Sequence, residues 1–211
     1  MNWIKTKTHS WLYCFVIHVM GLFFLVFYRH KVHGLENYIK GGAIIAGNHT
    51  SFYDPPLVSV SCPEEIHFLA RRTLFRNPLF GWLIRSLNSH PVGGAGSDVA
   101  SFRTVLKLLG EGKKVLLFPE GTRNKDGLGE MQGGLGLLSI KSGCPIIPVY
   151  IKGADIVFGR GRKFPKLWGK TSVTFCKPID PKSFVNLDKK QAIEQIAQTF
   201  ASEMKRCASS Y

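Results

Sequence analysis

The chain has 211 residues, enough for one domain with a sizeable core, and its hydrophobic fraction of 45% argues against a disordered chain. Lysine and arginine outnumber aspartate and glutamate by 28 to 14, so the formal net charge is +14 and anionic partners are expected. No GxGxxG or GxxxxGK[ST] motif is present, which argues against a nucleotide-binding loop.

The first predicted element is an apolar helix from Trp11 to Tyr28. It carries no charge when His18 is neutral, and as a helix it would be roughly 27 Å long, close to the hydrocarbon thickness of a bilayer. A buried core helix and a cleaved signal peptide are the alternatives, although bulky basic residues rather than a small-residue cleavage site follow Tyr28. We therefore predict that residues 1–40 anchor the protein to a membrane, either by spanning it or by dipping into one leaflet.

Short β-type runs then alternate with helical patterns. One helical pattern follows Ser97, with Val99, Phe102, Leu106 and Leu109 as its expected core face, and another covers residues 193–204. The alternation predicts an α/β fold over residues 41–211, with a mostly parallel or mixed central sheet flanked by helices. The predicted strands are 43–46, 66–70, 89–92, 114–118, 146–151 and 171–175.

His49 and Asp54 follow the first predicted strand at a spacing of five. A histidine can take a proton near neutral pH, and a nearby carboxylate can fix its tautomer and stabilise the cation that forms, so the pair is suited to activating a hydroxyl group. Asp54 also precedes Pro55 and could simply cap a helix, with one oxygen capping while the other accepts from His49. For His49 the alternative is a hydrogen-bonded histidine without a catalytic role.

Polar residues also follow two further predicted strands. Arg71 comes after residues 66–70, and Glu120, Gly121, Thr122 and Arg123 come after residues 114–118. Ligands bind beyond the carboxyl ends of strands in open α/β sheets, so His49, Arg71 and Glu120 converge if the three strands are parallel neighbours. The turn and the guanidinium of Arg123 suit a phosphate group. A base beside a phosphate site indicates a phosphorylated alcohol as substrate, unless Glu120, Arg123 and Arg71 are only solvated surface charges.

The segment 159–170 holds five cations and no acid, interleaved with Phe164, Leu167 and Trp168. Cations attract anionic headgroups and aromatic rings enter the membrane interface, so this is a candidate membrane-contacting loop; an ordinary surface loop is the alternative. The five cysteines, Cys14, Cys62, Cys144, Cys176 and Cys207, show no CxxC spacing and are interpreted as reduced. We expect no metal site.

Taken together, the motifs resemble those of the 1-acyl-glycerol-3-phosphate acyltransferase family. The four blocks are HxxxxD at His49 to Asp54, a second block from Phe68 to Val92, Phe118-Pro119-Glu120-Gly121-Thr122-Arg123, and Cys144 to Val149. The resemblance implies that His49 is the general base, that Asp54 orients it, that Glu120, Gly121, Thr122 and Arg123 form the glycerol-phosphate site, and that Arg71 contacts the phosphate.

The cysteine pattern and the lack of a secretory signal predict an enzyme at the cytoplasmic face of a membrane, and the apolar helix makes it monotopic or single-pass. The resemblance implies that this enzyme acylates lysophosphatidic acid. The acyl group would come from coenzyme A or acyl carrier protein as co-substrate, with no other cofactor and no nucleic acid as partner. The alternatives are glycerol-3-phosphate or another lysophospholipid as acceptor, and a non-catalytic membrane-binding module.

Overall fold

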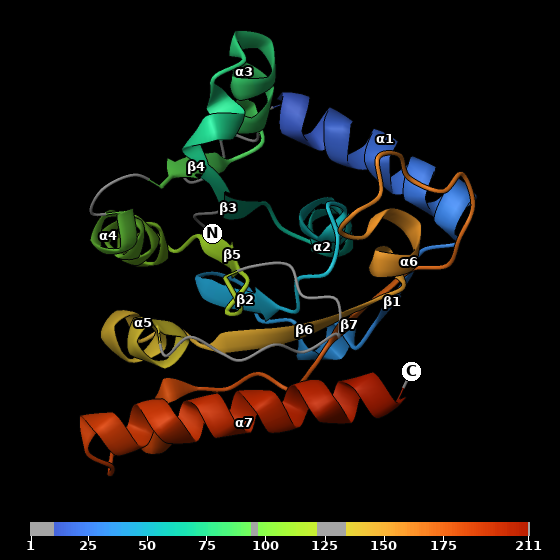
Figure 1. Ribbon diagram of the computed structural model, residues 1–211. Coiled ribbons are helices and arrows are strands. Elements are labelled where there is room, and N and C mark those ends of the chain that lie inside the picture. Colours follow the sequence, from blue (N-terminus) through green and yellow to red (C-terminus); the bar gives the residue numbers. More distant parts are fainter. Residues whose placement is uncertain (1–10, 94–96, 122–133, 211) are drawn as a thin grey trace, which may run out of the picture.

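A seven-stranded sheet forms the centre of the computed structural model, which describes residues 11–93, 97–121 and 134–210. The strand order is β1-β7-β6-β2-β5-β3-β4, and β7 runs antiparallel to β6 while the other neighbours are parallel (Figure 1). This is the mostly parallel α/β sheet that the sequence predicts. The strands are β1 (Lys31–His33), β2 (Ala43–Gly47), β3 (Ile66–Arg71), β4 (Ser89–Val92), β5 (Lys114–Leu117), β6 (Ile146–Lys152) and β7 (Ser172–Phe175).

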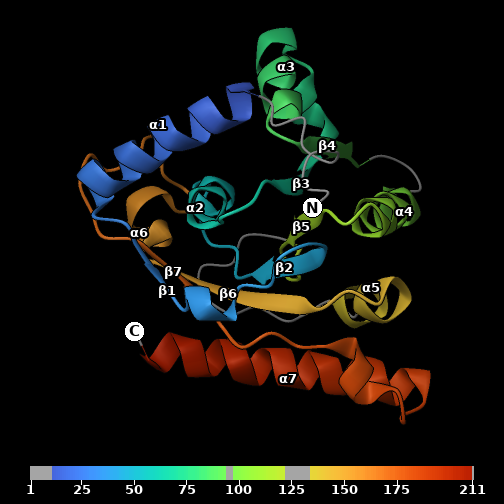
Figure 2. The same ribbon diagram turned by 180° about the vertical axis from the view of Figure 1, so that it is seen from behind.

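Helices cover both faces of the sheet, as the two opposite views show (Figures 1 and 2). Buried residues of α1, α2 and α6 pack on one face, and those of α4, α5 and α7 pack on the other. The short α3 contributes no buried residue to either cluster and lies beside β4. The helices are α1 (Trp11–Tyr28), α2 (Asp54–Ser61), α3 (Pro78–Ser86), α4 (Ser97–Gly110), α5 (Gly134–Ser142), α6 (Ala154–Phe158) and α7 (Lys189–Ser210), with 3-10 turns η1 (Leu35–Asn37), η2 (Arg72–Phe75) and η3 (Pro181–Phe184).

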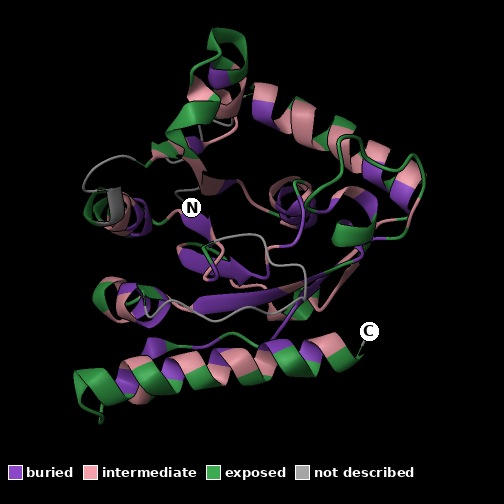
Figure 3. Cartoon of the chain, viewed as in Figure 1, coloured by how far each residue is buried: buried purple, intermediate pink, exposed green. Residues whose placement is uncertain are grey.

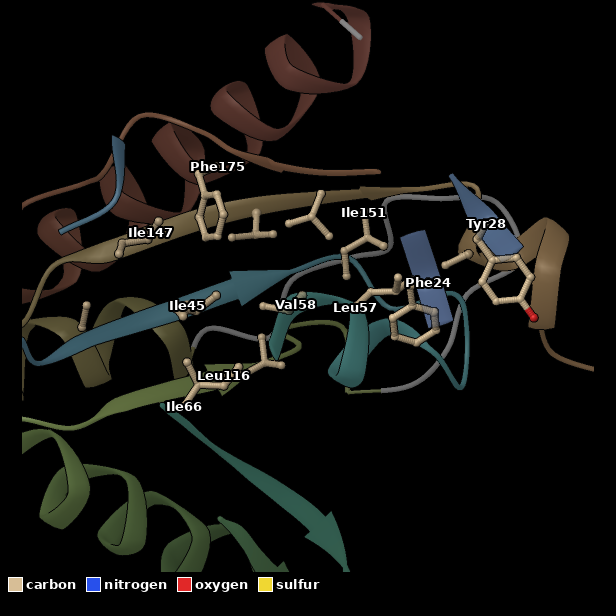
Figure 4. Packing of buried hydrophobic residues seen from close by; sticks show 14 of the residues in the cluster. Phe24, Tyr28, Ile45, Leu57, Val58, Ile66, Leu116, Ile147, Ile151 and Phe175 are labelled. Carbon is tan, nitrogen blue, oxygen red and sulfur yellow. The ribbon is translucent and has the colours of Figure 1, made fainter. Parts of the chain in front are cut away.

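Strand β2 lies in the middle of the sheet, and all five of its residues are buried. Successive side chains of a strand point to opposite faces. Ala43 and Ile45 therefore join the cluster under α1 and α2, whereas Ile44 and Ala46 join the cluster under α4 and α7. Figure 4 shows the first of these clusters, in which Ile45 of β2 and Leu116 of β5 pack against α2. An unbroken apolar run is what a strand buried on both faces requires.

The six predicted strands and the three predicted helices are confirmed. Strand β1 is missed by the pattern because it has three residues, two of them polar, at the edge of the sheet. The expected core face of α4 is partly wrong. Val99 is 59% exposed, and Val105, Leu108 and Leu109 are the buried residues, because the helix meets the sheet only in its second half.

Two of the cysteines are joined. Cys176, directly after β7, and Cys207, in α7, are both buried and form a disulfide across the contact between the sheet and α7. The prediction that all five cysteines are reduced is therefore wrong for this pair. Cys14, Cys62 and Cys144 are free.

Helix α1 is attached to the body along one side. Phe24 and Tyr28 are buried in the core cluster, and α1 packs along α2. Several apolar side chains on its outward side are exposed and form an apolar stripe. Figure 3 shows exposed and intermediate residues along most of the length of α1. By length and composition α1 could cross a membrane, and only 17% of it is buried in the protein. The stripe consists of Trp11, Phe15, Val19, Leu22 and Val26.

Candidate active site

The carboxyl edge of the parallel strands gathers the predicted site residues. Strands β2, β5 and β3 are consecutive, parallel neighbours in the sheet. His49 lies two residues beyond the end of β2, Glu120 lies three residues beyond the end of β5, and Arg71 is the last residue of β3. The prediction that these three strands end side by side is confirmed. The site therefore occupies the position where ligands bind in open α/β sheets.

His49 and Asp54 form a direct hydrogen bond, with 2.8 Å between the ring Nδ1 of His49 and Oδ2 of Asp54. The side chain of Asp54 is fully buried, while that of His49 keeps 20% of its surface exposed. An ionised carboxylate can only accept hydrogen bonds, so Nδ1 carries the proton of the neutral ring. The lone pair is then on Nε2, which is the atom that can accept a proton from a substrate.

Asp54 also holds the turn that separates it from His49. Its Oδ2 accepts the backbone N–H groups of Thr50 and Ser51, both at 2.7 Å. Asp54 therefore binds His49 and the backbone of Thr50 and Ser51 through the same oxygen. This corrects the capping interpretation, in which the second oxygen would serve the helix: Oδ1 is buried and has no hydrogen-bond partner among the residues that the structure describes.

Two further residues shape the site, and the sequence interpretation assigned a role to neither. The ring of Phe118 stacks on the imidazole of His49, with centroids 4.1 Å apart and planes 17° from parallel. Asn48 is buried and bonds both backbone groups of Ile151, donating to its oxygen at 2.9 Å and accepting from its nitrogen at 2.8 Å. Asn48 thus ties the loop after β2 to β6, and Phe118 restricts the ring plane of His49. Both residues lie at or near the carboxyl end of a predicted strand, 43–46 for Asn48 and 114–118 for Phe118, and that position was the available signal.

The start of α2 offers few N–H donors for an oxyanion that develops during the reaction. Pro55 and Pro56 have no N–H group. The N–H of Leu57 donates to the oxygen of Tyr53, and that of Tyr53 donates to Oγ of Ser51. The N–H of Phe52 donates to the oxygen of Phe158, and the N–H groups of Thr50 and Ser51 serve Asp54.

The third block, which begins at Phe118, forms a tight turn over its described residues. The N–H of Gly121 donates to the oxygen of Phe118 at 3.0 Å, and Gly121 has a φ of 67°, in the left-handed region that glycine adopts readily. Glu120 is buried in this turn, so it is not a solvated surface charge. Thr122 and Arg123 lie outside the described residues.

Arg71 is exposed at the end of β3 and makes no hydrogen bond or ion pair with His49 or Glu120 within the described part of the chain. The structure therefore brings His49 and Asp54 into contact and places Arg71 and Glu120 at the same edge. Residues 11–93, 97–121 and 134–210 contain no group of three or more histidine, cysteine, aspartate or glutamate side chains suited to a metal ion.

Known proteins are similar to this chain in sequence. A chloroplastic 1-acyl-sn-glycerol-3-phosphate acyltransferase of Arabidopsis thaliana is 30% identical over 158 residues, which is 72% of this chain and 44% of that protein. The enzyme of the same name from Bacillus subtilis is 26% identical over 177 residues, 83% of this chain and 86% of that protein. The chain spans less than half the length of the plant relatives it matches.

A solved structure is also similar. The crystal structure of the 1-acyl-sn-glycerophosphate acyltransferase PlsC from Thermotoga maritima superposes with a TM-score of 0.70 at 26% identity, covering 94% of this chain and 83% of that one. The model of the family described as Acyltransferase matches residues 29–152, which include β2, the His49–Asp54 pair and the turn after β5. The chain therefore belongs to the acyltransferase family.

Proposed function

We propose that this protein transfers a fatty acyl group from a thioester donor, acyl-coenzyme A or acyl carrier protein, to the free sn-2 hydroxyl of 1-acyl-glycerol-3-phosphate. The hydrogen bond between His49 and Asp54 at the carboxyl edge of the sheet is the observation that carries the proposal. Relatives named for this activity and the matching family support it.

The proposed reaction needs no covalent acyl-enzyme. Nε2 of His49 takes the proton of the sn-2 hydroxyl while the hydroxyl oxygen attacks the thioester carbon. The carbon–sulfur bond then breaks, and the imidazolium returns its proton to the leaving thiolate. Buried Asp54 stabilises the imidazolium, and stacking against Phe118 keeps Nε2 directed at the acceptor. We assign the acceptor phosphate to Glu120, Gly121, Thr122 and Arg123, together with Arg71.

We further propose that residues 1–40 anchor the enzyme to the cytoplasmic face of a membrane. Because α1 buries Phe24 and Tyr28 and packs along α2, its apolar stripe is best placed to enter one leaflet while the body stays attached. The segment 159–170 continues this surface, since the ring of Trp168 lies 5.0 Å from that of Phe27 at the end of α1. Figure 1 shows this segment curving around the end of α1.

The segment has the composition of an interfacial loop. Its apolar side chains are well exposed, Phe164 by 81%, Leu167 by 63% and Trp168 by 62%. Helix α3 lies near one end of α1 in Figures 1 and 2. It also has exposed apolar residues, namely Leu79, Phe80 and Trp82. Aromatic rings flanked by cations bind the headgroup region of anionic membranes.

Product analysis tests the reaction and the acceptor together. The purified protein is offered lysophosphatidic acid, glycerol-3-phosphate and another lysophospholipid, each with acyl-coenzyme A and acyl carrier protein thioesters, and products are identified by mass spectrometry. We expect phosphatidic acid. A product from a different acceptor would refute the substrate assignment. Liposome binding with no consumption of any thioester would instead identify a membrane-binding module.

A further inference from the structure

A basic hollow of about 850 Å³ adjoins the candidate active site. Asn48 and Thr50, the chain neighbours of His49, form part of its wall, and the ends of β1, β6 and β7 form most of the rest. No salt bridge joins its four cations to any described residue. The charged residues of the lining are Arg29, Lys31, Lys152 and Lys170, with Asp155 as the single acid.

The strand register builds a polar platform in this hollow. Ser172 of β7 pairs with Lys31 of β1 on one side and with Lys152 of β6 on the other. Paired residues of neighbouring strands point to the same face of a sheet, and strands lie about 4.8 Å apart, so the two lysine Cα atoms are separated by about 10 Å. Two residues along the strands, His33 and Tyr150 occupy the same face in a second row.

The walls of the hollow are held by hydrogen bonds within the protein. The N–H of Lys31 donates to the oxygen of Thr171 at 3.1 Å, and the N–H of Thr171 donates to the oxygen of Tyr28 at 3.0 Å. Gly153 has a φ of 80°, and a Cβ there would lie 2.1 Å from the backbone oxygen of Lys170, so only glycine permits this close approach. The hollow is therefore formed before any ligand enters.

The lining matches a phosphate group. Lys31 and Lys152 flank Ser172 in the sheet, and their ammonium groups and the Ser172 hydroxyl can all donate to phosphate oxygens. Burial and then the charge of Asp155 raise the pKa of Tyr150, so its hydroxyl keeps its proton and is a fourth donor. Like charges at this spacing repel one another, and a bound anion removes that repulsion.

The position of the hollow indicates which phosphate it takes. Lys31 of β1 lies three strand spacings from β2, which is about 14 Å. His49 lies two residues beyond the end of β2. Thioester donors carry their phosphates at the end of a long pantetheine arm, remote from the reacting carbon. We propose that this hollow binds the phosphate groups of the acyl donor, coenzyme A or the phosphopantetheine of acyl carrier protein, an inference that rests on the proposed function.

Calorimetric titration with free coenzyme A tests the site without any acyl transfer. The variant Lys31→Gln/Lys152→Gln removes two cations of the platform, and Lys189→Gln/Lys190→Gln removes two exposed cations at the start of α7 as a matched control. We expect the platform variant to bind coenzyme A about tenfold more weakly or worse, because charged hydrogen bonds are lost, and the control to match the unaltered protein. Equal affinity in all three proteins would overturn the proposal.

Steady-state kinetics separates donor phosphates from lipid headgroups. The platform variant should raise KM for acyl-coenzyme A or for acyl carrier protein thioester and leave KM for lysophosphatidic acid unchanged. Weaker binding to phosphatidylglycerol vesicles with an unchanged donor KM would assign the hollow to a lipid headgroup and refute the donor site. If the platform variant transfers acyl groups with an unchanged donor KM, only the inference about the hollow is refuted. If the unaltered protein binds coenzyme A at the hollow but transfers no acyl group, the proposed function is refuted and the binding site is not.

Discussion

Replacing Asp54 by asparagine separates its electrostatic contribution from its structural one. Asparagine has the same shape, and its amide oxygen can still accept from the N–H groups of Thr50 and Ser51. Its NH₂ group then occupies the place of Oδ1, which is buried and has no partner within the described part of the chain. A buried NH₂ group left without an acceptor costs about 1–3 kcal/mol of folding free energy, which for a chain of this size lowers Tm by roughly 2–12 °C.

The effect of Asp54→Asn on the rate should be larger than its effect on stability. A neutral amide cannot stabilise the imidazolium that forms when Nε2 takes the substrate proton, and a loss of roughly 10²–10⁴-fold in kcat is expected by comparison with other histidine–carboxylate pairs. That range corresponds to about 3–5 kcal/mol of transition-state free energy. The thiol released from acyl-coenzyme A gives the rate, and a thermal melt gives the stability.

Asp54→Ala is the companion variant for this measurement. It leaves two buried N–H groups without an acceptor, so it should lose about 2–6 kcal/mol of folding free energy. The catalytic reasoning is refuted if Asp54→Asn keeps a kcat within threefold of the unaltered enzyme while the protein remains folded.

Three further predictions follow from individual contacts. Phe118→Ala removes the ring that stacks on His49 and should lower kcat by about 2–10-fold with little change in acceptor KM. An unchanged kcat would show that stacking does not orient the His49 imidazole. Burial lowers the pKa of His30 to about 4, below its usual 6.5. Between these two pH values the unfolded chain binds one more proton than the folded protein, so the free energy of unfolding should fall as the pH drops from 6.5 towards 4. His30→Gln should flatten that slope by up to about 1.4 kcal/mol per pH unit in denaturant titrations, and an unaltered slope would contradict the assignment. Phe164→Ser/Trp168→Ser should weaken flotation with anionic vesicles and leave turnover of a short-chain soluble donor intact; full vesicle binding would exclude this loop from the membrane surface.

The order and type of the main elements could be predicted from the sequence because local patterns determine them. The run Ala43-Ile44-Ile45-Ala46 is apolar at every position, as a strand covered on both faces must be. The proximity of His49 and Asp54 also follows from a spacing of five with a turn between them. Strand β1 could not be predicted from the local pattern because its stability comes from pairing with β7, about 140 residues later in the chain.

The parts of the site that could not be predicted depend on contacts between distant segments. Asn48 bonds Ile151 across 103 residues, and Phe118 reaches His49 from another strand. The choice of one Asp54 oxygen for all three hydrogen bonds depends on the exact turn geometry, which residue types do not determine. Two lysines flanking Ser172 follow from the register of three strands, which periodicity does not reveal.

The central claim is that Nε2 of His49 takes the proton of the acceptor hydroxyl. It is tested most directly by His49→Ala, assayed with lysophosphatidic acid and an acyl thioester, with phosphatidic acid quantified by mass spectrometry and folding checked by thermal melt. The account predicts a folded protein that still binds vesicles and makes phosphatidic acid at least about 100-fold more slowly. A folded His49→Ala variant that makes phosphatidic acid at the rate of the unaltered protein would contradict it.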